Sequence, residues 1–235
     1  MPQHPRTAPF LGILMLDTAF PRVIGDAGNP ASYPFPAKIK IVTGAGALDI
    51  VTPGQPDRTL LQGFIAAAQE LEQEGAVGLV STCGFLIHFQ EQLAQAVNIP
   101  VMVSALSLYP MLRTAIGSAP IGILTASTES LTNGALECAN IADQDVVIAG
   151  FETCTAFSQT ILAAKPTTDA DFDPKEICKF AVAQATHLLK QNPNIGGYLL
   201  ECGNLPPYAA AIRAATGKPV VSILDAAQLI WSASN

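Results

Sequence analysis

The chain has 235 residues, of which 49% are hydrophobic and 13% are charged, and its formal net charge is −7. This length suits one large domain or two small ones with a substantial core. The negative net charge provides no basic surface for nucleic acid, so a nucleic-acid partner is not expected. No uninterrupted apolar run approaches the roughly 18 residues of a transmembrane helix, so a membrane partner is not expected either.

Short apolar runs alternate with longer amphipathic stretches along the whole chain. The apolar runs predict strands at residues 11–16, 38–42, 77–82, 100–104, 121–125, 145–150, 196–201 and 219–223. Between them, residues 59–74 have apolar side chains at helical spacing, and Asp173 followed by Pro174 is typical of the start of a helix, here one running to about Gln191. This alternation predicts an α/β fold with parallel sheets and helices on both faces.

Residues 18–37 differ from the rest because proline and glycine are frequent in them. We expect an ordered loop over the edge of the sheet, and a loop of this length within a compact domain often has a function. Arg22 in this loop is either a contact for a distal acidic group of a substrate or, as is more frequent for arginine, a surface residue.

An internal repeat divides the chain into two similar halves. LGILMLD at residues 11–17 matches IGILTAS at 121–127, and GLVSTCGF at 78–85 matches GYLLECGN at 197–204. The spacing from Cys83 to Pro100 equals the spacing from Cys202 to Pro219, and each proline opens another predicted strand. Three matches in the same order predict two similar α/β lobes.

Cys83 and Cys202 hold equivalent positions at strand ends, and each is followed by a glycine. Ligands of open parallel sheets bind beyond the carboxyl ends of the strands, and glycine lets the backbone approach a ligand closely. If the lobes are related by a pseudo-twofold axis, the two thiols meet across one cleft. Such a pair suits inversion of a carbon stereocentre, in which one group removes a proton and the other delivers one to the opposite face.

Residues near the two cysteines are candidates for binding the substrate. Backbone N–H groups and polar side chains there could stabilise the charge that develops on a carboxylate, by roughly 3 kcal/mol for each donor. The candidates are Thr82, Gly84, Phe85, Gly203 and Asn204, together with Asp17, Thr125 and Ser127 at the ends of the matched first strands. For Asp17 and Ser127 the alternative is a capping role, and for Thr82 a structural one.

The other cysteines and the histidines have ordinary structural explanations. Cys138, Cys154 and Cys178 lie outside the matched positions and are expected to be small core side chains. Five scattered cysteines favour reduced thiols in the cytoplasm over a disulfide framework. Three dispersed histidines do not predict a metal site.

The segments GILMLDT, STCGF, IGILTAS, ECGNLPPY and GKPVVSILDA resemble the aspartate/glutamate/hydantoin racemase superfamily. The resemblance covers most of the chain and implies two α/β lobes with the active site between them, one catalytic cysteine in each lobe, no cofactor and commonly a dimer. It also implies that the last strand and helix return to the first lobe. The expected lobes are therefore 1–118 with 219–235, and 119–218.

The expected function is a cofactor-independent racemase or epimerase of a small carboxylate-bearing substrate, such as an amino acid or a hydantoin, with Cys83 and Cys202 as acid and base. The family resemblance implies two alternatives, an arylmalonate-type decarboxylase and a maleate-type cis-trans isomerase, because CGF and CGN differ from the usual racemase neighbourhoods. A non-catalytic protein that binds a small ligand is an alternative of another class.

Overall fold

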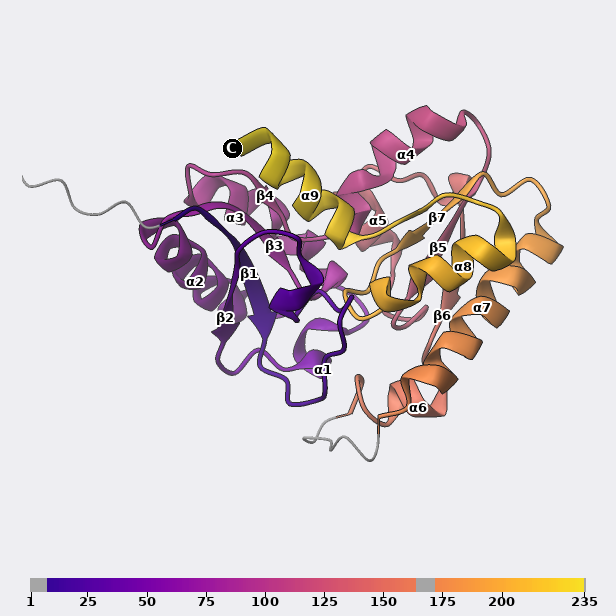
Figure 1. Ribbon diagram of the computed structural model, residues 1–235, viewed down its shortest axis with the longest axis horizontal. Helices are drawn as coiled ribbons and strands as arrows, with labels where there is room; N and C mark the ends of the chain where they lie inside the picture. Colours follow the sequence, from indigo (N-terminus) through magenta and orange to yellow (C-terminus); the bar gives the residue numbers. More distant parts are fainter. Residues whose placement is uncertain (1–7, 164–171, 235) are drawn as a thin grey trace, which may run out of the picture.

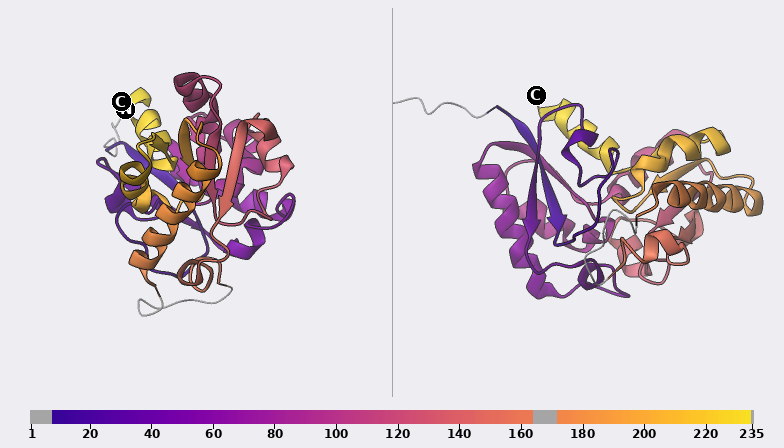
Figure 2. Two further views of the ribbon diagram at one scale, coloured as in Figure 1. Left: turned by 90° about the vertical axis from the view of Figure 1, so that its right-hand side faces the viewer. Right: turned by 60° about the horizontal axis from the view of Figure 1, so that its bottom comes forward.

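The computed structural model describes residues 8–163 and 172–234 and contains two four-stranded parallel sheets within this part of the chain. The strand order is β2-β1-β3-β4 in the first sheet and β6-β5-β7-β8 in the second, so the two sheets have the same topology (Figure 1). The two sheets lie in separate lobes, which the second panel of Figure 2 shows side by side. This confirms the α/β fold with two similar lobes.

The first lobe alternates strands with short helices. Its elements are β1 (Phe10–Leu16), β2 (Ala37–Val42), α1 (Ala47–Ile50), α2 (Leu61–Gln73), β3 (Ala76–Ser81), α3 (Gln90–Ala96) and β4 (Val101–Met102). Six of the seven residues of β1 are buried, as expected for the central strand of a parallel sheet. The predicted helix at 59–74 is α2, which buries Phe64, Ala68 and Leu71 against the sheet.

The second lobe repeats this arrangement after the connecting helix α4 (Tyr109–Ile116). Its elements are β5 (Ile121–Thr125), α5 (Asn133–Cys138), β6 (Val146–Gly150), α6 (Thr155–Ser158), α7 (Pro174–Gln191), β7 (Gly197–Leu200), α8 (Ala209–Thr216) and β8 (Val220–Val221). The Asp173 side chain accepts hydrogen bonds from the backbone N–H groups of Lys175 and Glu176 and so caps α7. All five residues of β5 are buried.

The C-terminal segment divides between the lobes differently from the expectation. Strand β8 pairs in parallel with β7 and therefore belongs to the second sheet. Only the following helix α9 (Ile223–Ser234) returns to the first lobe (Figure 1). There Ile230 lies against Gly78 of β3. The expected return of strand and helix together is wrong for the strand, because Val220 and Val221 complete the β7 edge. The exact limits of the lobes stay a prediction.

The loop between β1 and β2 is ordered, as predicted, and it reaches the second lobe. The Ala27 N–H donates to the Gly203 carbonyl at 2.9 Å, and the Asn204 amide donates to Asp26 at 2.6 Å. Within the loop, the Tyr33 hydroxyl donates to the Ala27 carbonyl at 2.7 Å. The loop therefore fastens the end of β1 to the segment that follows β7.

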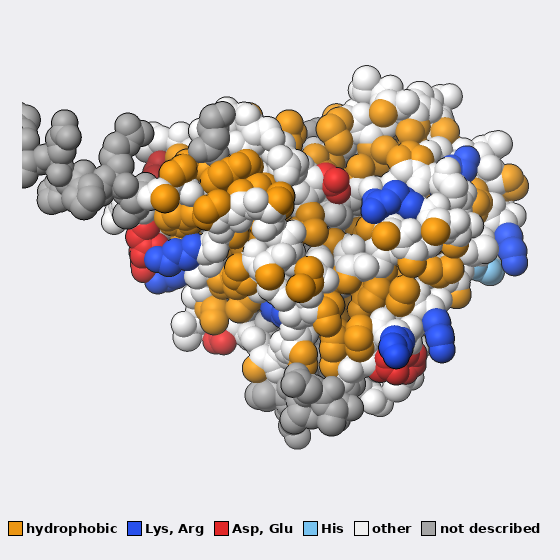
Figure 3. Space-filling model, in the orientation of Figure 1, with side chains coloured by type: hydrophobic (Ala, Val, Ile, Leu, Met, Phe, Trp, Pro, Cys, Tyr) orange, Lys and Arg blue, Asp and Glu red, His pale blue; other side chains and the backbone are white. Residues whose placement is uncertain are grey.

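Two surface properties bear on the partners expected from the sequence. Within 8–163 and 172–234, the structure has no helix that is both long and apolar enough to cross a membrane. The basic side chains on the face shown in Figure 3 are few and scattered, and apolar side chains separate them. This face therefore offers no continuous positive patch.

Candidate active site

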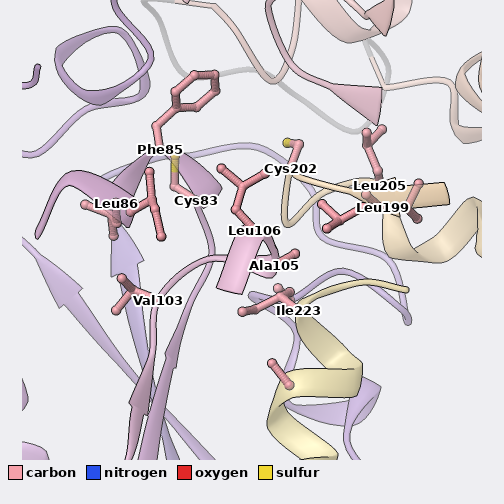
Figure 4. Packing of buried hydrophobic residues seen from close by; sticks show 14 of the residues in the cluster. Cys83, Phe85, Leu86, Val103, Ala105, Leu106, Leu199, Cys202, Leu205 and Ile223 are labelled. Carbon is pink, nitrogen blue, oxygen red and sulfur yellow. The ribbon is translucent and has the colours of Figure 1, made fainter. Parts of the chain in front are cut away.

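Cys83 and Cys202 line one cavity between the lobes. Cys83 lies two residues beyond the end of β3, and Cys202 lies two residues beyond the end of β7. Figure 4 shows the two side chains on loops from opposite lobes. The empty space of this pocket is about 360 Å³, a volume that includes open solvent at its mouth, and both cysteine residues are 7% exposed. The structure thus brings the two repeat-matched cysteines together.

The segments that carry the cysteines pack against each other reciprocally. A Cβ atom on Gly84 would lie 2.3 Å from the Glu201 carbonyl oxygen, and a Cβ atom on Gly203 would lie 2.4 Å from the Thr82 carbonyl oxygen. The glycine after each cysteine therefore meets the residue before the other cysteine. Any larger side chain would separate the two strand ends.

The polar partners of Cys83 lie close to it in the chain. The Ser81 hydroxyl accepts from the Cys83 N–H at 3.2 Å and donates to the Val103 carbonyl, which fixes the strand end. Burial raises the pKa of the Cys83 thiol, and the nearby Glu201 carboxylate raises it further. The N–H groups of Phe85 and Leu86, which hydrogen-bond to the sulfur, act in the opposite direction.

Cys202 belongs to a chain of polar contacts that leads into the loop of the first lobe. Its Sγ donates to Asn204 Oδ1 at 3.4 Å, and Asn204 donates to Asp26. Burial raises the pKa of Cys202, Glu201 is the second cause, and the charge of Cys83 is a smaller one. Both thiols are therefore protonated at neutral pH unless a bound group changes their surroundings.

Glu201 is a buried carboxyl group in the wall of the cavity and is only 1% exposed. Its Oε2 accepts from the Thr125 hydroxyl at 2.9 Å, whereas Oε1 has no hydrogen-bond partner within the described structure. Burial raises its pKa from an ordinary 4.5 to about 7, against the opposing effects of hydrogen bonds from Thr125 and the Ala126 N–H. Glu201 is not among the residues predicted from the sequence. The sequence pattern that could have indicated it is an acidic residue directly after the four buried residues of β7.

Arg22 also lines the cavity, where its side chain is 11% exposed. Its guanidinium pairs with Asp26 at 2.7 Å, donates to Thr18 at 2.9 Å and lies 4.4 Å from the centre of the Phe20 ring. The more frequent outcome for an arginine, a surface position, does not apply here. The long proline-rich and glycine-rich loop positions this cation beside the thiols.

The remaining predicted residues divide into three groups. Thr82, Gly84, Phe85 and Asn204 line the cavity. Thr125 lies behind Glu201 and holds it, and Gly203 provides the close contact between the lobes. Asp17 instead accepts from the Gly44 N–H at 2.9 Å and borders a different pocket, and Ser127 accepts from the Ser130 N–H.

The other cysteines lie outside this cavity. Cys154 is buried, Cys178 is half-buried and Cys138 is exposed, with its Sγ 3.7 Å from His88 Nδ1. All five cysteines are in the described ranges and are free thiols. No group of three or more His, Cys, Asp and Glu side chains in those ranges is arranged to hold a metal ion.

The cavity therefore combines two thiols from opposite lobes, a buried carboxyl group and an arginine. A thiolate formed here can accept a proton from a carbon acid, because water is largely excluded and the acceptor is held in place. The arginine can pair with a carboxylate. The arrangement suits proton removal next to the carboxylate of a small substrate.

Comparison with solved structures supports the fold. Unliganded arylmalonate decarboxylase aligns with a TM-score of 0.59 and 18% identity over 96% of this chain and 91% of that one. Allantoin racemase from Klebsiella pneumoniae aligns with a TM-score of 0.61 and 16% identity over 94% and 86% of the two chains. An aspartate racemase homologue from Pyrococcus horikoshii OT3 gives 0.57 and 16% over 96% and 99%. The chain therefore has the same fold as arylmalonate decarboxylase and allantoin racemase, which is the two-lobed α/β fold that the sequence predicted.

Comparison of sequences finds relatives whose activity differs from the expected racemase activity. No protein-family model matches the chain. A dimethylsulfoniopropionate lyase of Durusdinium sp. clade D is 30% identical over 224 residues, which are 92% of this chain and 72% of that protein. Dimethylsulfoniopropionate lyase 3 of Emiliania huxleyi is 31% identical over 90% of this chain and 56% of that protein, and lyase 7 is 29% identical over 90% and 63%. The chain thus spans between about half and three quarters of these relatives.

These relatives correct the expected function. They are lyases, so the expectation of an isomerase that racemises or epimerises its substrate is wrong, and so are the decarboxylase and cis-trans isomerase alternatives. They give no support to a non-catalytic binding protein either. The repeat and the paired cysteines predict the fold, but one fold supports several reactions, so they do not select the reaction. The extent of the match to the Durusdinium protein establishes that this chain belongs to the dimethylsulfoniopropionate lyase family.

Proposed function

We propose that the protein is a lyase that cleaves a β-sulfonio carboxylate of the dimethylsulfoniopropionate type. The observation that carries this proposal is the 30% identity to the Durusdinium lyase over 92% of this chain. The cavity supports it, because a lyase of this kind needs a base next to the carbon that bears the acidic proton. It also needs groups that hold a small, charged substrate.

The reaction requires one proton acceptor. A thiolate takes a proton from the carbon adjacent to the carboxylate, and the electrons of the broken C–H bond form the C=C bond. The C–S bond breaks with its electron pair remaining on sulfur, so that neutral dimethyl sulfide and acrylate are released. The thiol then returns its proton to solvent. Atoms and charge balance without an oxidant, a reductant or a second substrate.

Cys83 and Cys202 are the proposed acid-base groups, and the surroundings of Cys83 favour it as the base. Two backbone N–H groups, those of Phe85 and Leu86, and the charge of Arg22 stabilise its thiolate. For Cys202 the stabilising contact is the N–H of Asn204. Cys202 would then lie on the opposite side of the substrate, where it lines the cavity and helps to exclude water.

The lining residues Thr82, Gly84, Phe85 and Asn204 are the proposed binding residues. When the proton leaves the carbon, negative charge spreads onto the carboxylate oxygens of the substrate. Hydroxyl and N–H donors held in a site that excludes water stabilise that charge. Arg22 supplies a fixed positive charge on the same wall, which favours the carboxylate end of the substrate.

The test is an assay of the purified protein with dimethylsulfoniopropionate at millimolar concentration. Headspace gas chromatography measures dimethyl sulfide, and proton NMR measures acrylate. We expect the two products in equal amounts, at a rate well above that of a Cys83→Ser, Cys202→Ser double variant. A folded parent protein that releases neither product would contradict the proposal.

A cytoplasmic location and a dimer remain predictions. The free thiols of all five cysteines are compatible with a reducing compartment. Sedimentation equilibrium of the purified protein would give the number of subunits, and fractionation of the source cells would give the compartment.

A further inference from the structure

One buried polar atom in the cavity lacks a partner. Glu201 Oε1 accepts no hydrogen bond, although the residue is only 1% exposed. A buried carboxylate oxygen without a donor costs free energy, and such atoms are uncommon in native proteins. An unsatisfied acceptor in the wall of a ligand cavity therefore indicates a group that the ligand supplies.

The rest of the Glu201 side chain is firmly held, which fixes the direction of this atom. Oε2 accepts from the Thr125 hydroxyl, and the Ala126 N–H also contributes to the carboxylate. Oε1 packs closely against the segment after Cys83, because a Cβ atom on Gly84 would lie only 2.3 Å from it. None of the ion pairs formed within the described ranges includes Glu201.

The chemistry around Oε1 favours a cationic group. The Glu201 charge raises the pKa of both thiols, and Arg22, the cation in the same cavity wall, pairs with Asp26 and not with Glu201. The rings of Phe20 and Phe85 line the same cavity. A carboxylate beside aromatic rings is a favourable environment for a sulfonium or quaternary ammonium group.

We propose that Glu201 binds the sulfonium group of the substrate and makes the cavity selective for zwitterions over simple carboxylates. This inference rests on the proposed function, since it assigns the cationic half of the same substrate. Arg22 provides the opposite charge for the carboxylate half. A sulfonium group next to Glu201 would also offset the charge that opposes ionisation of the two thiols, so the substrate itself would help to form the base.

The experiment compares two ligands of the same shape that differ in charge. The probes are 3-(trimethylammonio)propionate and 4,4-dimethylpentanoate, and isothermal titration calorimetry at pH 8 measures the binding of each. We expect the parent to bind the cationic probe at least about tenfold more tightly, which is about 1.4 kcal/mol. Glu201→Gln should remove most of this preference and change the affinity for 4,4-dimethylpentanoate by less than about threefold.

Two further variants separate charge from shape. Glu201→Asp keeps the carboxylate and should retain part of the preference, even if Glu201→Gln were to fold poorly. Glu152→Gln removes an exposed carboxylate outside the cavity and should leave the preference unchanged. Equal affinity of the parent for both probes, or a preference that survives Glu201→Gln, would overturn the assignment.

The binding comparison does not depend on turnover. If the parent selects the cationic probe through Glu201 but releases no dimethyl sulfide, the proposed reaction is wrong and the cation site stands. If dimethyl sulfide is released but Glu201→Gln leaves both the KM and the probe preference unchanged, the reaction stands and the role of Glu201 is wrong.

Discussion

Gly84 and Glu201 are in contact across the boundary between the lobes. A Cβ atom on Gly84 would come within 2.3 Å of both the carbonyl oxygen and Oε1 of Glu201. Gly203 makes the equivalent approach to Thr82 from the other side. The distance between the two catalytic candidates, Cys83 and Cys202, is therefore set by two residues that lack side chains.

Alanine at either glycine should damage the site. The added methyl group of Gly84→Ala or Gly203→Ala meets backbone oxygen, which cannot move aside cheaply. We expect each variant to unfold at a lower urea concentration, with a loss of about 1–3 kcal/mol in the free energy of unfolding. Each should also lose most of its activity. Urea denaturation followed by circular dichroism and the dimethyl sulfide assay measure the two effects.

Gly134 provides the matched control. It lies in α5, and a Cβ atom there would approach no atom more closely than 3.7 Å. Gly134→Ala should be neutral or slightly stabilising, because alanine favours helices. Parent-like activity and stability in the Gly84→Ala variant would show that the contact between the strand ends has no functional role.

Serine at the two cysteines should separate their roles. We expect Cys83→Ser to lower kcat at least about 100-fold, since a hydroxyl is a far weaker proton acceptor than a thiolate. Cys202→Ser should lower kcat less, because in our proposal Cys202 forms the opposite wall. The rates of acrylate formation measure both effects.

Cys138→Ser is the control for loss of a thiol, because Cys138 is exposed and lies outside the cavity. Its activity should equal that of the parent. If Cys202→Ser loses more activity than Cys83→Ser, the roles of the two thiols are exchanged. If both variants keep the parent rate, neither thiol is the base.

The sequence alone predicts the strands and the pairing of Cys83 with Cys202 because both leave periodic signals. Buried parallel strands appear as apolar runs, and duplication places the cysteines at matching positions. The sequence does not indicate which sheet β8 joins, because Val220 and Val221 are apolar residues that suit the edge of either sheet, whereas the structure pairs them with β7. Only the edge that β7 leaves open determines where they pair.

Glu201 and Arg22 could not be assigned in the same way, because their roles depend on contacts between distant segments. The Glu201 carboxylate is held by Thr125 from the neighbouring strand, and nothing in the sequence near Glu201 indicates this bond. Arg22 is nearly buried because its loop crosses to the second lobe, where Asn204 binds Asp26. The reaction class was missed for a related reason, since a single fold supports several reactions.

The ion pair of Arg22 and Asp26 should be important for stability. Both side chains are nearly buried, at 11% and 5% exposure, and Asp26 also accepts from Asn204 and the Gly28 N–H. Arg22→Met removes the compensating charge, so we expect a loss of about 3–5 kcal/mol in the free energy of unfolding.

A double-variant cycle tests this coupling. Asp26→Asn alone should also destabilise the protein, and the combination with Arg22→Met should cost less than the sum of the two single changes. Urea denaturation of the four proteins gives the coupling energy. Additive effects would show that the two groups do not stabilise each other in the fold.

The raised pKa of Glu201 makes a prediction about stability and pH. Burial raises this pKa from 4.5 to about 7, so between these values the unfolded chain has released a proton that the folded protein still holds. Unfolding is therefore favoured as the pH rises through this window, and Glu201 costs the folded protein roughly 3 kcal/mol above it.

Glu201→Gln lacks this titration. Its free energy of unfolding, measured by urea denaturation from pH 4.5 to 8, should rise relative to that of the parent up to about pH 7 and then run parallel. Glu152→Gln corrects for the loss of one negative charge, and a difference that stays flat across the window would show that folding does not raise the pKa of Glu201.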